Sequence, residues 1–469
     1  MTHSSSMPLP RRAFLVGAAA TLALPTVSRG DTAPLPLVAR PGKAQLTPDG
    51  YPETAIWGFE GQAPGPVLRA RQGGRLARRL VNELPVPTSV HWHGIRNDNA
   101  MDGVAGLTQE PVAPGASFDY TFDLPDAGTY WYHAHTQSYE QVARGLYGAL
   151  IVEEPEAPDV DREEVLILDD WRLDRETAQI AEDFGAWHDL SHAGRLGNIV
   201  TTNGAFDLNL AALRNERLRL RLVNAANARV LALALIGLEG WVMALDGMPL
   251  DRPQTAEGEL ILAPGQRLDL IVDVTADEGE TAHLAHLAND GKWWSQVAWT
   301  VDGAVASNPR PAPGPLPPNP RQAVPGVTEA RRVTMRMEGG AMGRMQAATY
   351  QGRRLSFREL AEQGQFWALN GTVGRTEAPL LEVDPGETIR VRVVNDTAFP
   401  HAMHLHGMHF REVLDAAALG PLRDTLLVQR GETREIAFVA DNPGDWLFHC
   451  HMLAHAAAGM TTWVKVGRS

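Results

Sequence analysis

The pattern around the only cysteine, Cys450, constrains this chain most. The segment His449-Cys450-His451 is followed by His455 and Met460. A single thiol cannot form a disulfide within the chain, so Cys450 serves either metal chemistry or packing. Two imidazoles, a thiolate and a weak axial thioether are the ligands of an electron-transfer copper site. One loop supplies three of these four ligands, which predicts that the second histidine comes from elsewhere. The other interpretation is a buried cysteine beside surface histidines.

Three further histidine clusters accompany this segment. In an extended strand, side chains at positions i and i+2 share a face, so each His-x-His pair aims two imidazoles at the same side. One such pair is weak evidence, but four pairs predict metal binding, and strong nitrogen donors favour Cu(II) over most divalent metals. The three clusters are His91-Trp92-His93, His133-Ala134-His135 and His401-Ala402-Met403-His404-Leu405-His406.

The same alternation separates Cys450 from its two neighbours. In a strand, Cys450 points to one face while His449 and His451 point to the other. A copper ion on the cysteine is then joined through a few covalent bonds to metals on the opposite face. This arrangement suits electron transfer and is wasteful for a purely structural site.

With these four motifs the chain resembles the three-domain multicopper oxidases, the family of laccases and cuprous oxidases, over nearly everything after its N-terminal leader. The resemblance implies four copper ions, of which one is type 1, one is type 2 and two are type 3. All twelve ligand positions of the family carry the expected residue types. The implied ligands are His401, Cys450, His455 and the axial Met460 for type 1; His91 and His404 for type 2; and His93, His133, His135, His406, His449 and His451 for type 3.

The resemblance also implies the reaction. A reducing substrate gives single electrons to the type 1 copper, and O₂ is reduced to water by four electrons at the trinuclear cluster. Electron entry is expected through a solvent-near ring of His455 or His401, followed by transfer along Cys450 to the flanking histidines. The substrate stays open among phenols, aromatic amines and metal ions such as Cu(I), Mn(II) and Fe(II), because a shared fold does not fix the pocket.

Other function classes give different expectations. A periplasmic copper-tolerance protein would act mainly as a cuprous or other metal-ion oxidase, or as a copper carrier. A copper nitrite reductase needs only a mononuclear partner site, which four His-x-His pairs argue against. A scaffold that has lost its metals is disfavoured because every ligand position is intact, and a copper store would not consume O₂ with a reductant.

Two positions bear on proton supply. Asp102 lies eleven residues after His91, where the family places a carboxylate near the type 2 and type 3 copper ions. A carboxylate there is a candidate catalytic proton relay, since O₂ reduction consumes protons; the alternative is an Asp-Gly turn. Many relatives carry a second carboxylate directly after the type 1 histidine, but this chain has Ala456. Protons must therefore use another group, or turnover is slower.

Soft side chains and isolated histidines give weaker signals. Met335 and Met337 alternate as core residues of a strand do. Met342 lies in the glycine-containing stretch 339–343 and Met345 just beyond it, and these two are the better candidates for binding Cu(I). His188 and His192, in a helix-like stretch, are expected to be surface or capping residues.

The N-terminus predicts export. Arg11-Arg12 precedes a short apolar run that ends near Pro25, which resembles a Tat signal within a leader at 1–35. The apolar run is too short to span a bilayer, and no later segment is a transmembrane candidate. The expected location is the periplasm, or outside the cell, after passage through the Tat machinery. A formal net charge of −14 argues against nucleic-acid binding.

An internal repeat predicts the domain organisation. Residues 73–82, 216–224 and 385–395 each combine alternating apolar and charged residues, as in half-buried strands, with a terminal asparagine. Three copies at such long intervals predict three homologous β-domains. The expected class is all-β, with three cupredoxin-like Greek-key sandwiches. The expected segments are domain 1 at 39–154, domain 2 at 162–305 as a spacer, a proline-rich linker at 306–326, and domain 3 at 327–469.

Overall fold

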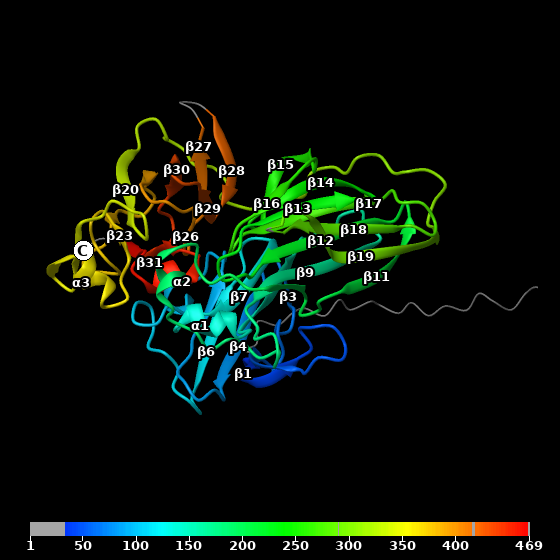
Figure 1. The fold of residues 1–469 in the computed structure, drawn as a ribbon. Coiled ribbons are helices and arrows are strands. Elements are labelled where there is room, and N and C mark those ends of the chain that lie inside the picture. The colour runs from blue at the N-terminus through cyan, green and yellow to red at the C-terminus, as the bar shows by residue number, and fades with distance from the viewer. Residues whose placement is uncertain (1–32, 289, 415–417, 468–469) are drawn as a thin grey trace, which may run out of the picture. The chain divides into compact units, whose positions relative to one another are not determined.

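The computed structural model describes residues 33–288, 290–414 and 418–467, and the regular secondary structure of this part of the chain is almost entirely β-strand (Figure 1). The predicted all-β class is therefore confirmed. The first 32 residues, including the twin arginines, lie outside the described residues. The strands form three pairs of sheets, and each pair comes from one continuous part of the chain. Among the described residues, no helix is both long enough and apolar enough to cross a membrane.

The first pair of sheets has the strand orders β2-β1-β4-β6 and β3-β8-β7-β5. In β4, Leu76 and Leu80 are buried while Arg75 and Arg79 are exposed, so this strand is half-buried as predicted. Trp92, Tyr120 and other buried side chains between the sheets form the core. The strands are β1 (Leu35–Ala44), β2 (Thr54–Phe59), β3 (Leu68–Arg71), β4 (Arg75–Asn82), β5 (Val90–His93), β6 (Ser117–Asp123), β7 (Gly128–Ala134) and β8 (Tyr147–Glu153).

The second pair has the orders β10-β9-β12-β17-β14-β15 and β11-β19-β18-β13-β16. Its strands are β9 (Arg162–Trp171), β10 (Ile199–Thr202), β11 (Leu208–Arg214), β12 (Arg217–Asn224), β13 (Leu231–Ile236), β14 (Leu238–Leu245), β15 (Met248–Thr255), β16 (Leu260–Leu262), β17 (Arg267–Val274), β18 (Thr281–Leu287) and β19 (Trp293–Ala304).

The prediction that β12 is half-buried is wrong, because all eight of its residues are buried. Its charged face lies against carboxylates: Arg219 donates to Glu154 and Asp269, and Arg217 donates to Asp273. Paired and hydrogen-bonded in this way, the guanidinium groups tolerate burial.

The third pair has the orders β23-β20-β25-β30-β27-β28 and β24-β32-β31-β26-β29, with a separate β21-β22 hairpin. Its strands are β20 (Arg331–Gly339), β21 (Ala347–Tyr350), β22 (Arg353–Ser356), β23 (Trp367–Leu369), β24 (Leu381–Val383), β25 (Thr388–Asn395), β26 (His401–Leu405), β27 (Phe410–Val413), β28 (Leu419–Arg423), β29 (Thr425–Val428), β30 (Thr433–Val439), β31 (Gly444–Cys450) and β32 (Thr461–Val466).

The three similar segments of the sequence take the same place in the three sheet pairs. β4, β12 and β25 each run parallel to the first long strand of their pair and antiparallel to β6, β17 or β30. Each ends in a buried asparagine, Asn82, Asn224 or Asn395. The Oδ1 atom of each accepts a hydrogen bond from the backbone N–H two residues later. Such a side-chain turn ends the strand and explains why asparagine recurs there.

Helices are short. They are a 3₁₀ turn (Asn99–Met101), α1 (Ser138–Ala143), α2 (Trp187–Ser191), α3 (Phe357–Ala361) and α4 (Leu453–Ala457). Residues 306–326 contain no strand or helix, and Asn319 fixes their end to the first sheet pair by donating to the carbonyl oxygen of Ala127.

Candidate metal centre

Two neighbouring strands in each of the first and third sheet pairs carry the histidine clusters. In the first pair, His91 of β5 lies opposite His133 of β7. In the third pair, His404 of β26 lies opposite His449 of β31. His135, His406 and His451 each follow one of these strands directly. Because facing residues of neighbouring strands share a face, each pair of strands presents four imidazoles to the same side.

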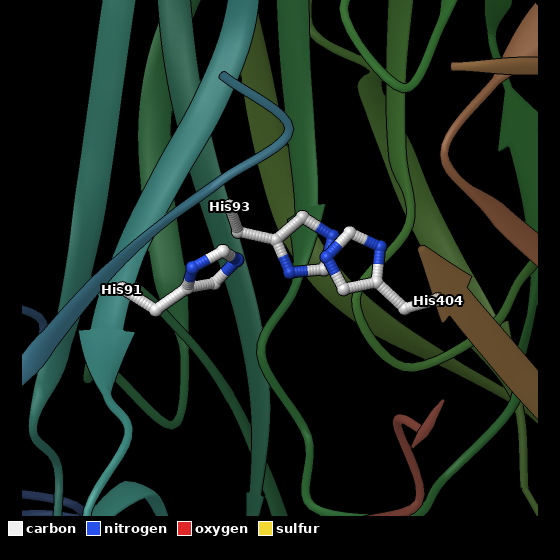
Figure 2. Close-up of side chains that lie close together, drawn as sticks. All are labelled: His91, His93 and His404. Carbon is white, nitrogen blue, oxygen red and sulfur yellow. The ribbon is translucent and has the colours of Figure 1, made fainter. Parts of the chain in front are cut away.

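These eight imidazoles meet between the first and third sheet pairs. Figure 2 shows His91 and His93 of β5 and His404 of β26 converging, and the rings of His93 and His404 are stacked with centroids 3.7 Å apart. Within each of three groups, the candidate ligand atoms lie within 4.8 Å of one another. The groups are His91, His93 and His404; His93, His133 and His451; and His135, His406 and His449. Every group draws on both sheet pairs.

Hydrogen bonds at the back of the rings direct one nitrogen of each ring inward. The Nδ1 atoms of His91, His133 and His404 donate to the carbonyl oxygens of Asp102, Ala134 and Asp424, respectively. Since a neutral imidazole has one N–H, the Nε2 atoms of these rings carry the lone pair. These Nε2 atoms are buried and without a hydrogen-bond partner. Buried polar atoms normally have partners, so their state indicates a cation between them.

A short contact between the rings of His406 and His449 also indicates a cation. His406 Nδ1 donates to Asp102 Oδ2 at 2.9 Å, and His449 Nδ1 donates to the carbonyl oxygen of Cys450 at 2.9 Å. Both Nε2 atoms therefore carry lone pairs, yet they face each other at 3.1 Å. Burial lowers the pKa of His449 to about 3, so this ring is neutral at ordinary pH. Neutral imidazole is the form that binds metals.

Asp102 lies at the edge of this cluster, with its carboxylate buried. Oδ2 accepts from His406, and Oδ1 lies 3.2 Å from His91 Nδ1. The turn interpretation also describes the backbone, because Gly103 has a φ of +82° and a Cβ there would lie 1.8 Å from the carbonyl oxygen of Val90. The turn thus places the carboxylate between two imidazoles.

Asp424, which the sequence analysis missed, is a second buried carboxylate at the cluster. Its Oδ1 accepts from His93 Nε2 at 3.2 Å, and both oxygens accept from Arg267 at 2.9 and 2.5 Å. Burial alone raises its pKa, but the charges of Arg267 and His93 hold the pKa of Asp424 well below its usual value. One signal was available: Asp424 is an isolated acidic residue before the apolar strand β29.

Cys450 forms a separate group with two histidines on the other face of β31. Its Sγ lies 3.6 Å from His401 Nδ1 and 3.7 Å from His455 Nδ1. His455 Nε2 donates to the carbonyl oxygen of His192, and His401 Nε2 donates to the Thr397 hydroxyl, whose own hydrogen goes to Asn395. Both Nδ1 atoms therefore carry lone pairs, 3.1 Å apart.

Burial keeps the side chains of this group uncharged at ordinary pH. Burial raises the pKa of the Cys450 thiol to about 12 and lowers the pKa of His455 to about 4. A metal ion that binds here must displace the thiol proton, as thiolate ligation requires. Met460 is fully buried, and its carbonyl oxygen accepts from the Cys450 N–H.

The expectation of a solvent-near histidine is wrong. His401 and His455 are both 0% exposed. For His455 the reason is the residue directly after α2, because the carbonyl oxygen of His192 covers its Nε2 atom. The second sheet pair also supplies Arg267 to Asp424, so it is more than the expected spacer.

The four methionines at positions 335, 337, 342 and 345 differ in their burial. Met335 and Met337 are fully buried in the core of the third sheet pair. Met345 is partly buried and packs against a second apolar cluster around Leu360. Met342 is 77% exposed.

Comparisons with known proteins agree with this geometry. The family described as multicopper oxidase matches residues 41–157 and again residues 347–469. The solved structure of Lac15 from a marine microbial metagenome is 42% identical, with a TM-score of 0.75, and covers 92% of this chain and 100% of its own. The chain belongs to the multicopper oxidases. A solved multicopper oxidase from Pseudomonas thermotolerans is 34% identical with a TM-score of 0.79, covering 93% of this oxidase and 100% of its own chain.

Curated relatives extend the likeness. Multicopper oxidase MmcO of Mycobacterium tuberculosis is 29% identical over 92% of this oxidase and 87% of that protein. The copper resistance protein A homolog of Pseudomonas syringae pv. tomato is 26% identical over 91% of each protein. The oxidase has the predicted cupredoxin-like fold. It is a copper-containing oxidoreductase that oxidises a reducing substrate with O₂ as the electron acceptor.

Proposed function

We propose that this oxidase binds four copper ions and reduces O₂ to water. His401, Cys450, His455 and Met460 would hold the type 1 ion, and His91 and His404 the type 2 ion. The two type 3 ions would each take one triad: His93, His133 and His451, or His135, His406 and His449. The observation that carries the proposal is the set of inward-facing lone pairs. The Nε2 atoms of His91, His133 and His404 have no hydrogen-bond partner, and those of His406 and His449 face each other at 3.1 Å.

The roles of the chain follow from this arrangement. Bound copper ions supply the one-electron redox chemistry. The peptide of Cys450 joins the thiol to the imidazoles of His449 and His451, so the electron path between the two groups of ligands is a few bonds long. Backbone carbonyl oxygens and the carboxylates of Asp102 and Asp424 hold the imidazoles in orientation, and such supporting contacts tune ligand basicity. Asp102 is also the carboxylate placed to pass protons to the cluster.

The domain and export hypotheses belong to the same proposal. We propose domains at 39–154, 162–305 and 327–469, with a linker at 306–326. The three sheet pairs, and the matching positions of β4, β12 and β25, support a threefold origin. The twin arginines support export by the Tat machinery from a leader at 1–35, with the periplasm as destination.

The test is copper stoichiometry together with oxygen uptake. We expect the purified, copper-loaded protein to contain four copper ions per chain and to consume one O₂ for every four equivalents of reductant. A copper content of two per chain, or accumulation of hydrogen peroxide as the product, would contradict the proposal.

The Asp102→Asn variant tests the role of the carboxylate. We expect kcat to fall by about 10- to 100-fold, the usual cost of losing a group that supports metal ligands. The blue absorption should stay unchanged, because Asp102 does not contact His401, Cys450 or His455. Asp102→Glu should recover part of the activity. Full activity in Asp102→Asn at unchanged copper content would show that Asp102 only forms the backbone turn with Gly103 and does not support the copper ions.

A further inference from the structure

A pocket of about 560 Å³ opens on the histidines of the cluster. It is lined by His135 and His449, two members of one triad, together with residues of α1 and α4. Of the eight imidazoles of the cluster, seven are buried and only His135 is partly exposed. Solvent can therefore approach this triad through the pocket.

Backbone contacts hold α1 beside α4 at this pocket. The side-chain amide of Asn227 donates to the carbonyl oxygen of Tyr139 in α1 at 2.8 Å. The carbonyl oxygen of Asn227 accepts from the N–H of Leu453, the first residue of α4, at 3.0 Å. From α4, Ala456 and Ala457 line the pocket. Their methyl groups leave space for water and supply no proton, so an acid in this pocket has to come from another element.

Glu140 of α1 is the only carboxylate among the described residues that line the pocket. Arg144 lies one helical turn later, and its Nε donates to Glu140 Oε1 at 2.8 Å. Oε2 has no hydrogen-bond partner in the described part of the chain, and the side chain is 28% exposed. One oxygen is thus fixed by the protein, while the other is left to water.

Arg144 is itself held in place from several sides. Its guanidinium group lies over the rings of Trp57 and Phe184, 4.6 and 4.7 Å from their centroids. Its terminal nitrogens donate to the two carboxylate oxygens of Glu182 at 3.0 and 2.5 Å. A planar guanidinium group that is stacked and paired in this way is preorganised for a further carboxylate. The position of Glu140 at the pocket is fixed as a result.

Glu140 is also the group of the pocket that can exchange protons with water at ordinary pH. The guanidinium groups of Arg144 and of Arg375, which shares the pocket lining, do not lose their protons. Burial keeps the other titratable rings of the lining uncharged, because it raises the pKa of Tyr139 and lowers the pKa values of His135 and His449. Proton supply through this pocket therefore depends on one carboxyl group.

We propose that Glu140 delivers protons from solvent, through water in the pocket, to the triad that contains His135 and His449; this inference rests on the proposed reduction of O₂ to water. Each O₂ takes up four electrons from the reductant and four protons, and gives two water molecules. For each proton, the O–H bond of the Glu140 carboxyl group breaks, pocket water carries the proton inward, and the carboxylate regains a proton from solvent. Asp102 serves the same triad from another side, since its Oδ2 accepts from His406.

The experiment compares proton uptake by the copper-loaded wild type, Glu140→Gln and Glu182→Gln. Glutamine keeps the size of glutamate and still accepts from Arg144, but it cannot release a proton to water. Glu182→Gln is the matched control, because Glu182 pairs with the same Arg144 and lies outside the pocket lining. A pH-indicator dye in stopped flow measures proton uptake when the fully reduced protein meets O₂. We expect the wild-type rate in Glu182→Gln and a rate at least about 100-fold lower in Glu140→Gln, the smaller contribution of a positioned proton-transfer group.

Two further measurements distinguish proton delivery from a structural effect. The blue absorption of Glu140→Gln, and the rate at which a reductant bleaches it without O₂, should equal those of the wild type, because electron entry takes up no proton from this pocket. Glu140→Asp keeps the carboxyl group, so it should take up protons faster than Glu140→Gln.

Three results would overturn this role of Glu140. They are a wild-type rate of proton uptake in Glu140→Gln, an equal slowing in Glu182→Gln, and a rate in Glu140→Asp no higher than in Glu140→Gln. Failure of the proposed function would instead appear in the wild type, as absence of blue absorption or as uptake of two protons rather than four for each O₂.

Discussion

The Cys450→Ser variant is expected to lose the intense blue absorption and more than about 100-fold of its turnover, beyond the usual cost of losing a supporting contact. Cys450 is the only soft anionic donor of the chain, and its Sγ faces two lone pairs at 3.6 and 3.7 Å. A serine hydroxyl is hard and stays protonated, so it cannot replace the thiolate. The variant also keeps the peptide that leads to His449 and His451 but loses the atom at which that path begins.

The copper content of the Cys450→Ser variant shows whether only the type 1 ion is lost or copper binding fails as a whole. The eight imidazoles between the first and third sheet pairs do not depend on the thiol, so we expect the variant to keep three of the four copper ions. Met403→Leu is the matched control, because Met403 faces Cys450 across the strand ladder and a leucine there conserves volume. That control should remain blue. An intensely blue, active Cys450→Ser protein would remove the type 1 assignment.

The sequence predicts correctly which histidines share a strand face, because strand alternation is local. His91 and His93, or His449 and His451, fall on a common face whatever the remainder of the chain does, and a cysteine between two histidines must point to the opposite face. The register that places His91 opposite His133 and His404 opposite His449 is not local, so the grouping into triads needed the structure.

Sequence analysis could not predict the contacts of backbone groups and distant charges, because these contacts are also not local in the sequence. The carbonyl oxygen of His192 covers His455 from 263 residues away, and a carbonyl group has no sequence signature. The burial of β12 on both faces likewise depends on carboxylates such as Glu154, which belong to another part of the chain. Alternating arginines therefore predicted a solvent-facing side that does not exist.

The Asp424→Ala variant is expected to lower the free energy of unfolding of the copper-free protein by about 3–5 kcal/mol, the usual cost of leaving a buried charge without its partner. Arg267 of β17 and the Asp424 carboxylate are 0% and 1% exposed, so no water replaces the lost contact. The same carboxylate accepts from His93, which belongs to the first sheet pair. Asp424 thus joins all three sheet pairs, and its removal loosens each contact.

Two further variants separate stability from copper binding. Asp273→Ala breaks another buried pair, with Arg217, far along β17 from the histidines; it should lower the unfolding midpoint similarly while leaving the copper content unchanged. Adding Arg267→Met to Asp424→Ala removes the unpaired charge and should recover part of the stability, because an apolar replacement of both partners costs little. Copper retention against a chelator should stay about 10- to 100-fold weaker in this double variant, since His93 still lacks its acceptor. If copper retention returned together with stability, Asp424 would affect copper binding only by stabilising the fold. The carboxylate of Asp424 would then not be needed to orient His93.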